Sequence, residues 1–343
     1  EAKEQLLQLK HDFQAEGKKD DPFELKYIID NFVRNPEIGF VPTDSIVMTV
    51  DKAAVLRSGM KLPHGKDSIP DKMFISLRGK RILTKSEMMV YEMLAHHDWT
   101  RPLYMSTTLG GDNQAGLDNY LMLEGLAARI TPFNVGSGGT DSERMYDNFM
   151  RKFRYGNVAD PKVYVDQTVM RPCYTHRLRM AQLAQQLILE GKRDKALKVL
   201  QKCEQVLPPS QVPYEVWSLG IDTKKHLLMM PECYRELGKT KEAEAILKSV
   251  ADRALAYFDW YNSFSENRLS SMSGDIMQQY EILGMALDGL QACKSSLIEN
   301  YKKRADVLAG TPAGRVLISA MNARRAADAQ RYLPEDAEEG AEY

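Results

Sequence analysis

The chain has 343 residues, a formal net charge of −1, 43% hydrophobic residues and 27% charged residues. This length allows two domains with separate cores, and the composition is that of an ordinary globular protein. The balanced charge excludes a global basic field for nucleic acid or an anionic membrane. No apolar run approaches the roughly 18 residues that a transmembrane helix needs.

The start of the chain and its cysteines indicate a piece of a longer protein with free thiols. The sequence begins Glu-Ala-Lys, without an initiator Met or a signal peptide, so we expect an excised piece of a longer protein or a processed product. The four cysteines contain no C-x-x-C pair, and their long spacings do not resemble a disulfide framework. Buried free thiols are therefore expected.

The first half of the chain alternates between helical and strand patterns. The predicted helices cover residues 1–15, about 21–33 from Asp21-Pro22, 51–59, 84–95, 118–125 and about 140–153. Asp51 is the expected cap of the helix over 51–59, and Thr84 and Glu87 have the spacing of a capping box. The predicted strands cover residues 46–50, 73–77, 103–107 and 127–132. This alternation predicts an α/β domain with a partly parallel sheet, or an α+β domain.

A polar turn between the predicted helix 84–95 and the strand 103–107 is the first candidate site. His96 and His97 would not converge on one metal ion, because successive helical residues point about 100° apart, so no metal or cofactor is expected here. Trp99 and Tyr104 either stack on a sugar or peptide or are buried in the core. Arg101 is available to pair with Asp98, Asp112 or Glu124. The candidate residues of this turn, for binding or for structure, are His97, Asp98, Trp99, Arg101, Tyr104, Asp112 and Asn113.

A glycine-rich loop, residues 134–139, is the second candidate site. A loop before a helix N-terminus can hold an anion or a glycan, because free N–H groups and the helix dipole favour negative charge. The loop lacks the order of a P-loop or a dinucleotide-binding fingerprint, and a flexible connector is the favoured interpretation. Thr140 and Glu143 have capping-box spacing and begin the helix that follows. The candidate anion or glycan residues are Gly136, Ser137, Gly138 and Thr140.

From about residue 170 the pattern is continuously helical. Residues 179–208 have the register of a tetratricopeptide unit, and the register recurs after an insertion of about residues 209–223. A small Ala lets two helices approach closely, and Gly permits the tight turn. The repeat-packing positions are Ala184, Gly191, Ala196, Tyr234, Gly238 and Ala243. We also expect one long helix over 275–308, a last helix to about residue 331 and a disordered acidic tail.

These patterns predict three segments. Residues 1–169 form the α/β domain, residues 170–333 form an all-α tetratricopeptide-like domain, and residues 334–343 form the tail. No nucleophile elbow or convincing Cys–His pairing occurs, so the residues alone indicate a binding or scaffolding unit.

Four long motifs also resemble a known family. They are HHDWTRPLYMS (96–106), GLDNYLMLEGLAARITPF (116–133), SERMYDNFMRKFRYGNVADPKVYVDQT (142–168) and AQLAQQLILEGKRDKALKVLQKCEQVLP (181–208). Together they resemble the soluble C-terminal region of a bacterial family of multi-pass membrane proteins. The membrane half of that family resembles GT-C glycosyltransferases of the protein O-mannosyltransferase type, and an animal transmembrane relative also ends in tetratricopeptide repeats.

The resemblance implies a place on the periplasmic face of the inner membrane, attached to a membrane domain of the same polypeptide that uses a lipid-linked sugar. The catalytic acid of GT-C enzymes lies in the membrane half, so no catalytic residue is carried onto this chain. The sequence departs from the family at Ala128, where an aromatic is usual, and at His96-His97, where an amide is more usual.

The leading prediction is therefore a non-catalytic accessory region that presents acceptor proteins or peptides and does not bind nucleic acid. One alternative is a helical-repeat scaffold for protein–protein interactions. The other is a free-standing enzyme with a site near Asp98, Asp112 and Asp141.

Overall fold

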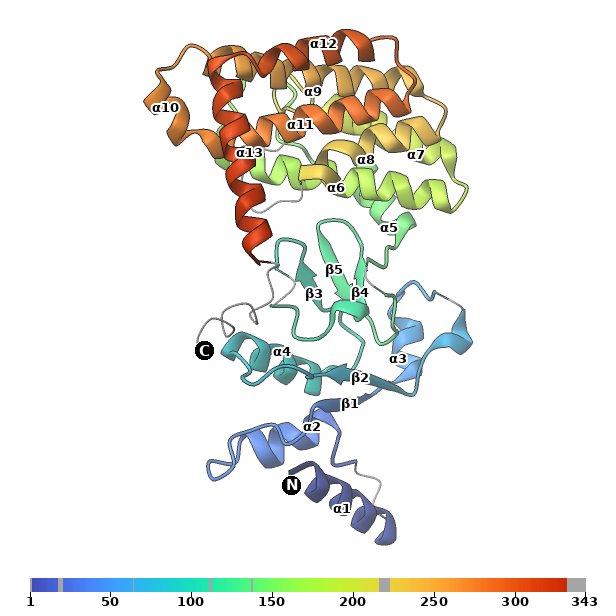
Figure 1. Ribbon diagram of the computed structural model, residues 1–343. Coiled ribbons are helices and arrows are strands. Elements are labelled where there is room, and N and C mark those ends of the chain that lie inside the picture. The colour runs from blue at the N-terminus through green and yellow to red at the C-terminus, as the bar shows by residue number, and fades with distance from the viewer. Residues whose placement is uncertain are drawn as a thin grey trace, which may run out of the picture. The chain divides into compact units, whose positions relative to one another are not determined.

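The structure is a computed structural model that describes residues 2–17, 21–63, 65–110, 113–136, 138–215 and 223–331 (Figure 1). The chain divides into two compact units, residues 1–153 (unit 1) and 154–343 (unit 2). The predicted domain boundary, between residues 169 and 170, lies further along the chain than this division after residue 153. The predicted acidic tail, residues 334–343, lies outside the described residues.

Unit 1 combines short helices with two small sheets, so the α-plus-β character predicted for this half is found. Its segments in chain order are α1 (Ala2–Ala15), α2 (Leu25–Ile28), the π-helical η1 (Ile29–Val33), β1 (Ser45–Thr49), α3 (Lys52–Arg57), the 3-10 helix η2 (Lys66–Ser68), β2 (Lys72–Ser76), α4 (Lys85–Ala95), β3 (Tyr104–Ser106), the 3-10 helix η4 (Asp118–Tyr120), β4 (Leu121–Leu123), β5 (Ala127–Ile130), α5 (Ser142–Asp147) and the π-helical η5 (Asn148–Lys152).

Both sheets are antiparallel, which corrects the expectation of a partly parallel sheet. The first sheet pairs β1 with β2, and the second has the order β3-β5-β4. In the first sheet Ile46 lies opposite Ile75 and Met48 lies opposite Met73, and all four side chains are buried. Cross-strand apolar pairs of this kind fix the register, because a shift by one residue would turn them to the solvent.

The helix predicted over residues 118–125 is wrong. Residues 118–120 form only a 3-10 turn, and Leu121–Leu123 form strand β4, which pairs with β5. The partner strand supplies a stabilisation that the local apolar spacing does not reveal, because strand stability depends on cross-strand packing.

Two helix starts differ from their predictions. Helix α2 begins after Glu24 and not at Asp21-Pro22, and the Asp21 carboxylate instead accepts a hydrogen bond from the Phe23 N–H at 3.1 Å. The N-cap of α5 is Asp141, which accepts the Arg144 N–H at 3.1 Å, so the capping box predicted from Thr140 is wrong. The capping box of α4, between Thr84 and Glu87, is confirmed.

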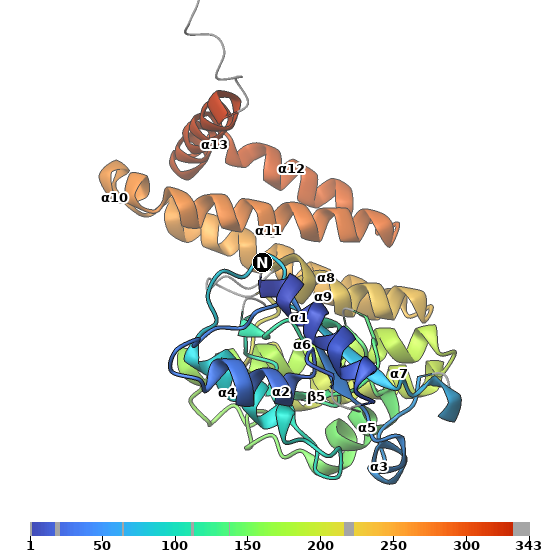
Figure 2. The ribbon, with the colours of Figure 1, turned by 90° about the horizontal axis from the view of Figure 1, so that it is seen from below.

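Unit 2 is helical in its described residues apart from loops. Its helices are α6 (Gln167–Leu189), α7 (Arg193–Val206), α8 (Thr223–Glu236), α9 (Thr240–Tyr261), α10 (Glu266–Ser271), α11 (Ser273–Ala292), α12 (Ile298–Leu308) and α13 (Pro312–Arg331). Helix α9 packs along α11, and α13 packs against α10 and α11 (Figure 2).

Two helical hairpins, α6–α7 and α8–α9, have the same turn. Gly191 and Gly238 adopt φ angles of 74° and 76°, a left-handed conformation in which glycine carries no Cβ penalty. The N–H of the residue after each glycine then bonds five residues back, Lys192 to Leu187 and Lys239 to Tyr234, both at 2.8 Å. The helix positions predicted to pack in these hairpins are buried: Ala184, Ala196, Tyr234 and Ala243.

The single helix predicted over 275–308 is wrong, because the chain turns between α11 and α12. Lys294 adopts a φ angle of 54°, and the Ser295 N–H bonds to the Leu290 carbonyl at 3.0 Å. The hydroxyl of Ser295 donates to the Glu244 carboxylate on α9. The turn therefore repeats the hairpin geometry with a lysine in the place of glycine, a signal that apolar periodicity does not contain.

The prediction of free thiols is confirmed. Cys173, Cys203 and Cys233 are free and buried, and Cys293 is free and half-buried.

Candidate functional site

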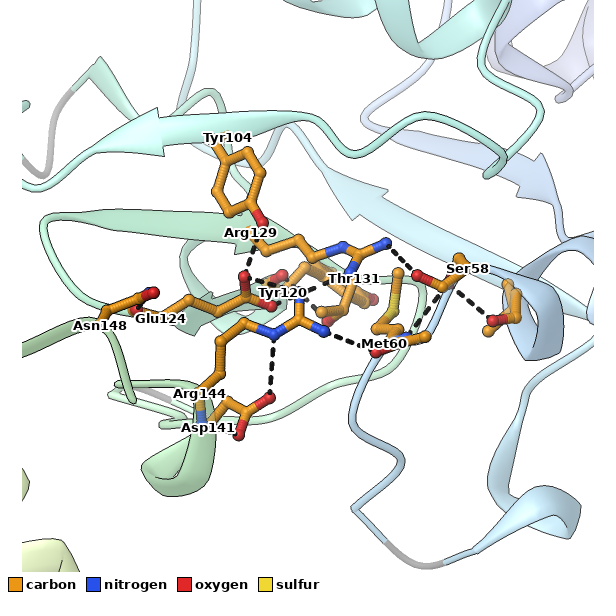
Figure 3. Close-up of polar contacts among 12 residues, drawn as sticks. Ser58, Met60, Tyr104, Tyr120, Glu124, Arg129, Thr131, Asp141, Arg144 and Asn148 are labelled. Carbon is orange, nitrogen blue, oxygen red and sulfur yellow. Dashed lines mark hydrogen bonds and ion pairs between the residues drawn. The ribbon is translucent and has the colours of Figure 1, made fainter. Parts of the chain in front are cut away.

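A buried cluster of charged groups lies at the second sheet of unit 1, and it is the strongest candidate for a functional site (Figure 3). Its centre is Glu124, which follows strand β4 and is 4% exposed. The carboxylate lies 3.9 Å from the guanidinium of Arg129 on β5 and accepts a hydrogen bond from Arg144 on α5 at 3.2 Å. The Tyr104 hydroxyl on β3 donates to the same carboxylate at 2.6 Å. Three strands and a helix thus converge on one carboxylate.

The two arginines also hold the loop that follows α3. Arg129 donates to the Ser58 carbonyl at 3.4 Å, and Arg144 donates to the Gly59 carbonyl at 2.8 Å. The guanidinium of Arg144 also lies 3.8 Å from the Asp141 carboxylate at the start of α5. The cluster therefore ties a loop, a sheet and a helix N-terminus together.

The electrostatics of the cluster favour fixed charges over proton transfer. Burial, together with the neighbouring Glu124 carboxylate, raises the pKa of the Tyr104 hydroxyl, so it remains a hydrogen-bond donor. Burial opposes the charge of Arg144, but Glu124 and Tyr104 outweigh that effect and its pKa is raised. The Glu124 carboxylate is held by two guanidinium groups and a hydroxyl that the fold fixes in place. We therefore interpret the cluster as structural.

The polar turn after α4 is not a single site. Trp99 is 1% exposed and adopts a φ angle of 63°, a strained conformation for a bulky residue. The His97 ring packs edge-on against it at 4.7 Å between centroids, and burial lowers the pKa of His97. Asp98 accepts hydrogen bonds from the Thr100 N–H and hydroxyl, at 3.0 and 2.6 Å. The turn is closed by its own residues, and Trp99 anchors it in the core.

The other candidate residues of this turn do not lie together in one site. Within the described residues Arg101 has no ion pair, and Glu124 is paired with Arg129 and Arg144 instead. Tyr104 joins the buried cluster. Asn113 is exposed, and its N–H bonds to the Gly110 carbonyl at 3.0 Å. Asp112 lies outside the described residues.

The glycine-rich loop is held by strand β4. The Leu123 N–H bonds to the Gly139 carbonyl at 2.7 Å, and the Asp141 N–H bonds to the Leu123 carbonyl at 2.9 Å. Gly136 and Gly138 have φ angles of 68° and 95°, and the Thr140 hydroxyl donates to the Gly138 carbonyl at 3.1 Å. Ser137 lies outside the described residues. The described part of this loop is thus paired like a strand at its C-terminal end.

The structure also bears on the site considered near Asp98, Asp112 and Asp141. Asp98 closes its own turn, and Asp141 caps α5 and faces Arg144. No group of three or more His, Cys, Asp or Glu side chains is placed to hold a metal ion within the described ranges.

Sequence reasoning missed Arg129 and Arg144 and treated Glu124 only as a partner for Arg101. One signal was available: Arg129 stands inside the short strand Ala127–Ile130, where an arginine needs a buried partner. The identity of that partner depends on strand pairing and could not be read from the sequence.

Comparison with known proteins gives a family match for the first part of the chain. Residues 1–148 match the family model described as TMEM260-associated domain 2. No curated protein and no solved structure matches the chain. Among the described residues, no helix has the length and apolar character needed to cross a membrane. Unit 1 is thus similar to a domain associated with a membrane-protein family.

Proposed function

We propose that this chain is an extracytoplasmic accessory region of a membrane-embedded glycosyltransferase of the GT-C, protein O-mannosyltransferase-like type. It is not catalytic by itself, and it lies on the periplasmic face of the inner membrane, attached to a membrane domain of the same polypeptide. The observation that carries the proposal is the match of residues 1–148 to the TMEM260-associated domain. The engagement of Glu124 and Asp141 with arginines supports a non-catalytic role.

In this proposal the hairpins of unit 2 are tetratricopeptide-like and present acceptor proteins or peptides. The shared turns at Gly191 and Gly238 and the buried small residues at Ala196 and Ala243 support this interpretation. Helical repeats of this kind expose extended binding surfaces, since each repeat packs only on its neighbours.

The test is a transfer assay with a lipid-linked sugar donor and a protein acceptor. The chain alone is expected to give no transfer, whereas the full polypeptide transfers sugar and loses acceptor use when this region is deleted. Transfer by the isolated chain would refute the non-catalytic assignment. Unchanged acceptor use after the deletion would refute the accessory role.

A scaffold that binds peptides without any link to glycosylation is the second candidate. A surface cavity of about 400 Å³ on α9 favours it, lined by Arg253, Ala256, Tyr257 and Trp260. Trp260 is 48% exposed, and Trp, Tyr and Arg are the side chains most often found at interaction hot spots. Calorimetric titration with peptides should show binding that Trp260→Ala removes and Leu189→Ala retains, since Leu189 is 76% exposed to solvent but does not line this cavity.

A further inference from the structure

A groove in unit 1 lies beside the loop that joins β2 to α4. The groove has a volume of about 640 Å³, and its apolar lining includes Phe40, Val41, Leu77, Ile82 and Leu83. Ile82 is 83% exposed and Phe40 is 52% exposed. An isoleucine on a loop gains nothing from this exposure in water, whereas an apolar surface that covered it would remove its side chain from solvent.

The same loop is strongly basic. The segment from residue 78 to residue 86, here called the basic loop, reads RGKRILTKS and contains four cations and no acidic residue. Arg78, Lys80, Arg81 and Lys85 thus surround Ile82 in sequence. Exposed apolar side chains among cations are the combination that inserts into the headgroup region of an anionic membrane.

The ion pairs of the basic loop leave two cations available. Lys80 pairs with the Glu87 carboxylate, and the Arg78 guanidinium lies 3.8 Å from Asp44. Arg81 and Lys85 have no acidic partner in the part of the chain that the structure describes, and both are exposed. With four cations and two carboxylates, the groove and its loop have a surplus of positive charge.

We propose that the basic loop and the adjoining groove are a docking surface for an anionic lipid bilayer, with Ile82 and Phe40 entering the headgroup region. The positive charge of the loop favours an anionic bilayer as the bound partner. Arg81 and Lys85 contact lipid phosphates, and the apolar side chains leave the water. A protein partner with an apolar surface alone would leave these two cations without a counter-charge. The proposal does not depend on the glycosyltransferase assignment.

The test uses the 343-residue chain and sedimentation with vesicles of phosphatidylcholine, alone or mixed with phosphatidylglycerol. Binding is expected to the anionic vesicles only, and it should weaken in high salt, because the Debye length falls from about 10 Å at 0.1 M to about 3 Å at 1 M. The double variant Arg81→Gln/Lys85→Gln should lose roughly 25-fold in the partition coefficient, at about five-fold for each cation near the surface. Ile82→Ser should lose about ten-fold, from the apolar burial that it gives up.

Matched controls come from helix α3 and the 3-10 helix η2, which follows it in the chain. Arg57→Gln/Lys66→Gln removes the same charge from two exposed cations outside the groove, and Leu56→Ser truncates an apolar side chain that is 44% exposed. Both controls should bind vesicles like the unmodified chain, and circular dichroism should show that every variant is folded. Equal losses in the controls, equal binding to neutral vesicles, or capture of a protein partner without any vesicle binding would each overturn the proposal.

Discussion

At the scale of single residues, the buried Glu124–Arg129 pair in unit 1 should be sensitive to the loss of either partner. Arg129 is 2% exposed, and its guanidinium has one carboxylate, Glu124, within ion-pair distance among the described residues. Such a pair contributes little compared with an apolar replacement of both partners, but the loss of one partner leaves a buried charge without compensation.

The substitution Glu124→Gln should therefore lower the free energy of unfolding of unit 1 by about 3–5 kcal/mol. Trp99 is the only tryptophan of residues 1–153, so its fluorescence during urea unfolding reports on this unit in a chain with Trp217→Phe and Trp260→Phe. Asp147→Asn is the control. It breaks ion pairs with Arg151 and Lys152, which are 74% and 63% exposed, and should change the free energy of unfolding little. A loss for Glu124→Gln no larger than that of this control would contradict the structural interpretation of the cluster.

Gly116 tests a close backbone contact. It has a φ angle of 71°, and a Cβ at this position would lie 2.7 Å from the Ser76 carbonyl oxygen at the end of β2. Gly116→Ala should cost more than about 2 kcal/mol, because the strained φ and the clash add. Gly136 has a nearly equal φ of 68° with no atom near its Cβ, so Gly136→Ala should cost only about 1 kcal/mol. Equal costs in urea unfolding would show that the contact at Ser76 is absent.

At the scale of elements, Glu87 in the first turn of helix α4 makes two separate interactions. The Glu87 carboxylate accepts the Thr84 N–H at 2.9 Å in the capping box, and it also pairs with the Lys80 ammonium. The hydrogen bond from Lys80, followed by that from the Thr84 backbone, lowers the pKa of Glu87 below its ordinary value of 4.5. The pair links the basic loop to the first turn of the helix.

This lowered pKa makes the stability of unit 1 sensitive to acid. Because the folded state favours ionised Glu87, its contribution is fully present above pH 4.5 and is lost as the pH falls through the lower folded pKa. Glu87→Gln should destabilise unit 1 at neutral pH, and the difference from the unmodified chain should shrink in acid. Glu37→Gln, at an exposed position, is the control and should cost little stability at neutral pH. A constant difference for Glu87→Gln would contradict the pairing with Lys80. Urea unfolding at several pH values measures both.

The elements that the sequence predicts well are those with local signals. The capping box at Thr84, the cap at Asp51 and the turns at Gly191 and Gly238 are all found. The wrong predictions concern features that the local sequence does not show. Residues 121–123 have a helical pattern, and only their pairing with β5 makes them a strand. Lys294 forms the turn after α11 without a glycine. The cluster around Glu124 was not predicted for the same reason, because its members come together only when β3, β4 and β5 pair.

At the scale of the whole chain, the two units differ in what stabilises them. Unit 1 has small sheets and relies on buried ion pairs and hydrogen bonds between distant segments. Unit 2 is built from helices, and its turns α6–α7, α8–α9 and α11–α12 share one geometry. Helices that are not consecutive in the chain also pack together, such as α9 with α11 and α6 with α8. A buried arginine of α6, Arg177, also holds the segment after α7 by donating to the carbonyls of Leu207 and Val212, at 2.9 and 2.5 Å.

The four cysteines all belong to unit 2, so their reactivity measures the opening of that unit as a whole. Burial raises the pKa of the Cys203 thiol to about 11 and that of the Cys233 thiol to about 12, and both side chains are buried. The thiolate is the reactive form, so these two thiols should resist a disulfide reagent at pH 8 in the native chain. Cys293 is half-buried and should react first, and a Cys293→Ser variant should leave little fast reaction. In denaturant all four should react together. Modification of Cys203 as fast as Cys293 in the native chain, measured by mass spectrometry, would mean that the helical core of unit 2 opens far more readily than its packing indicates.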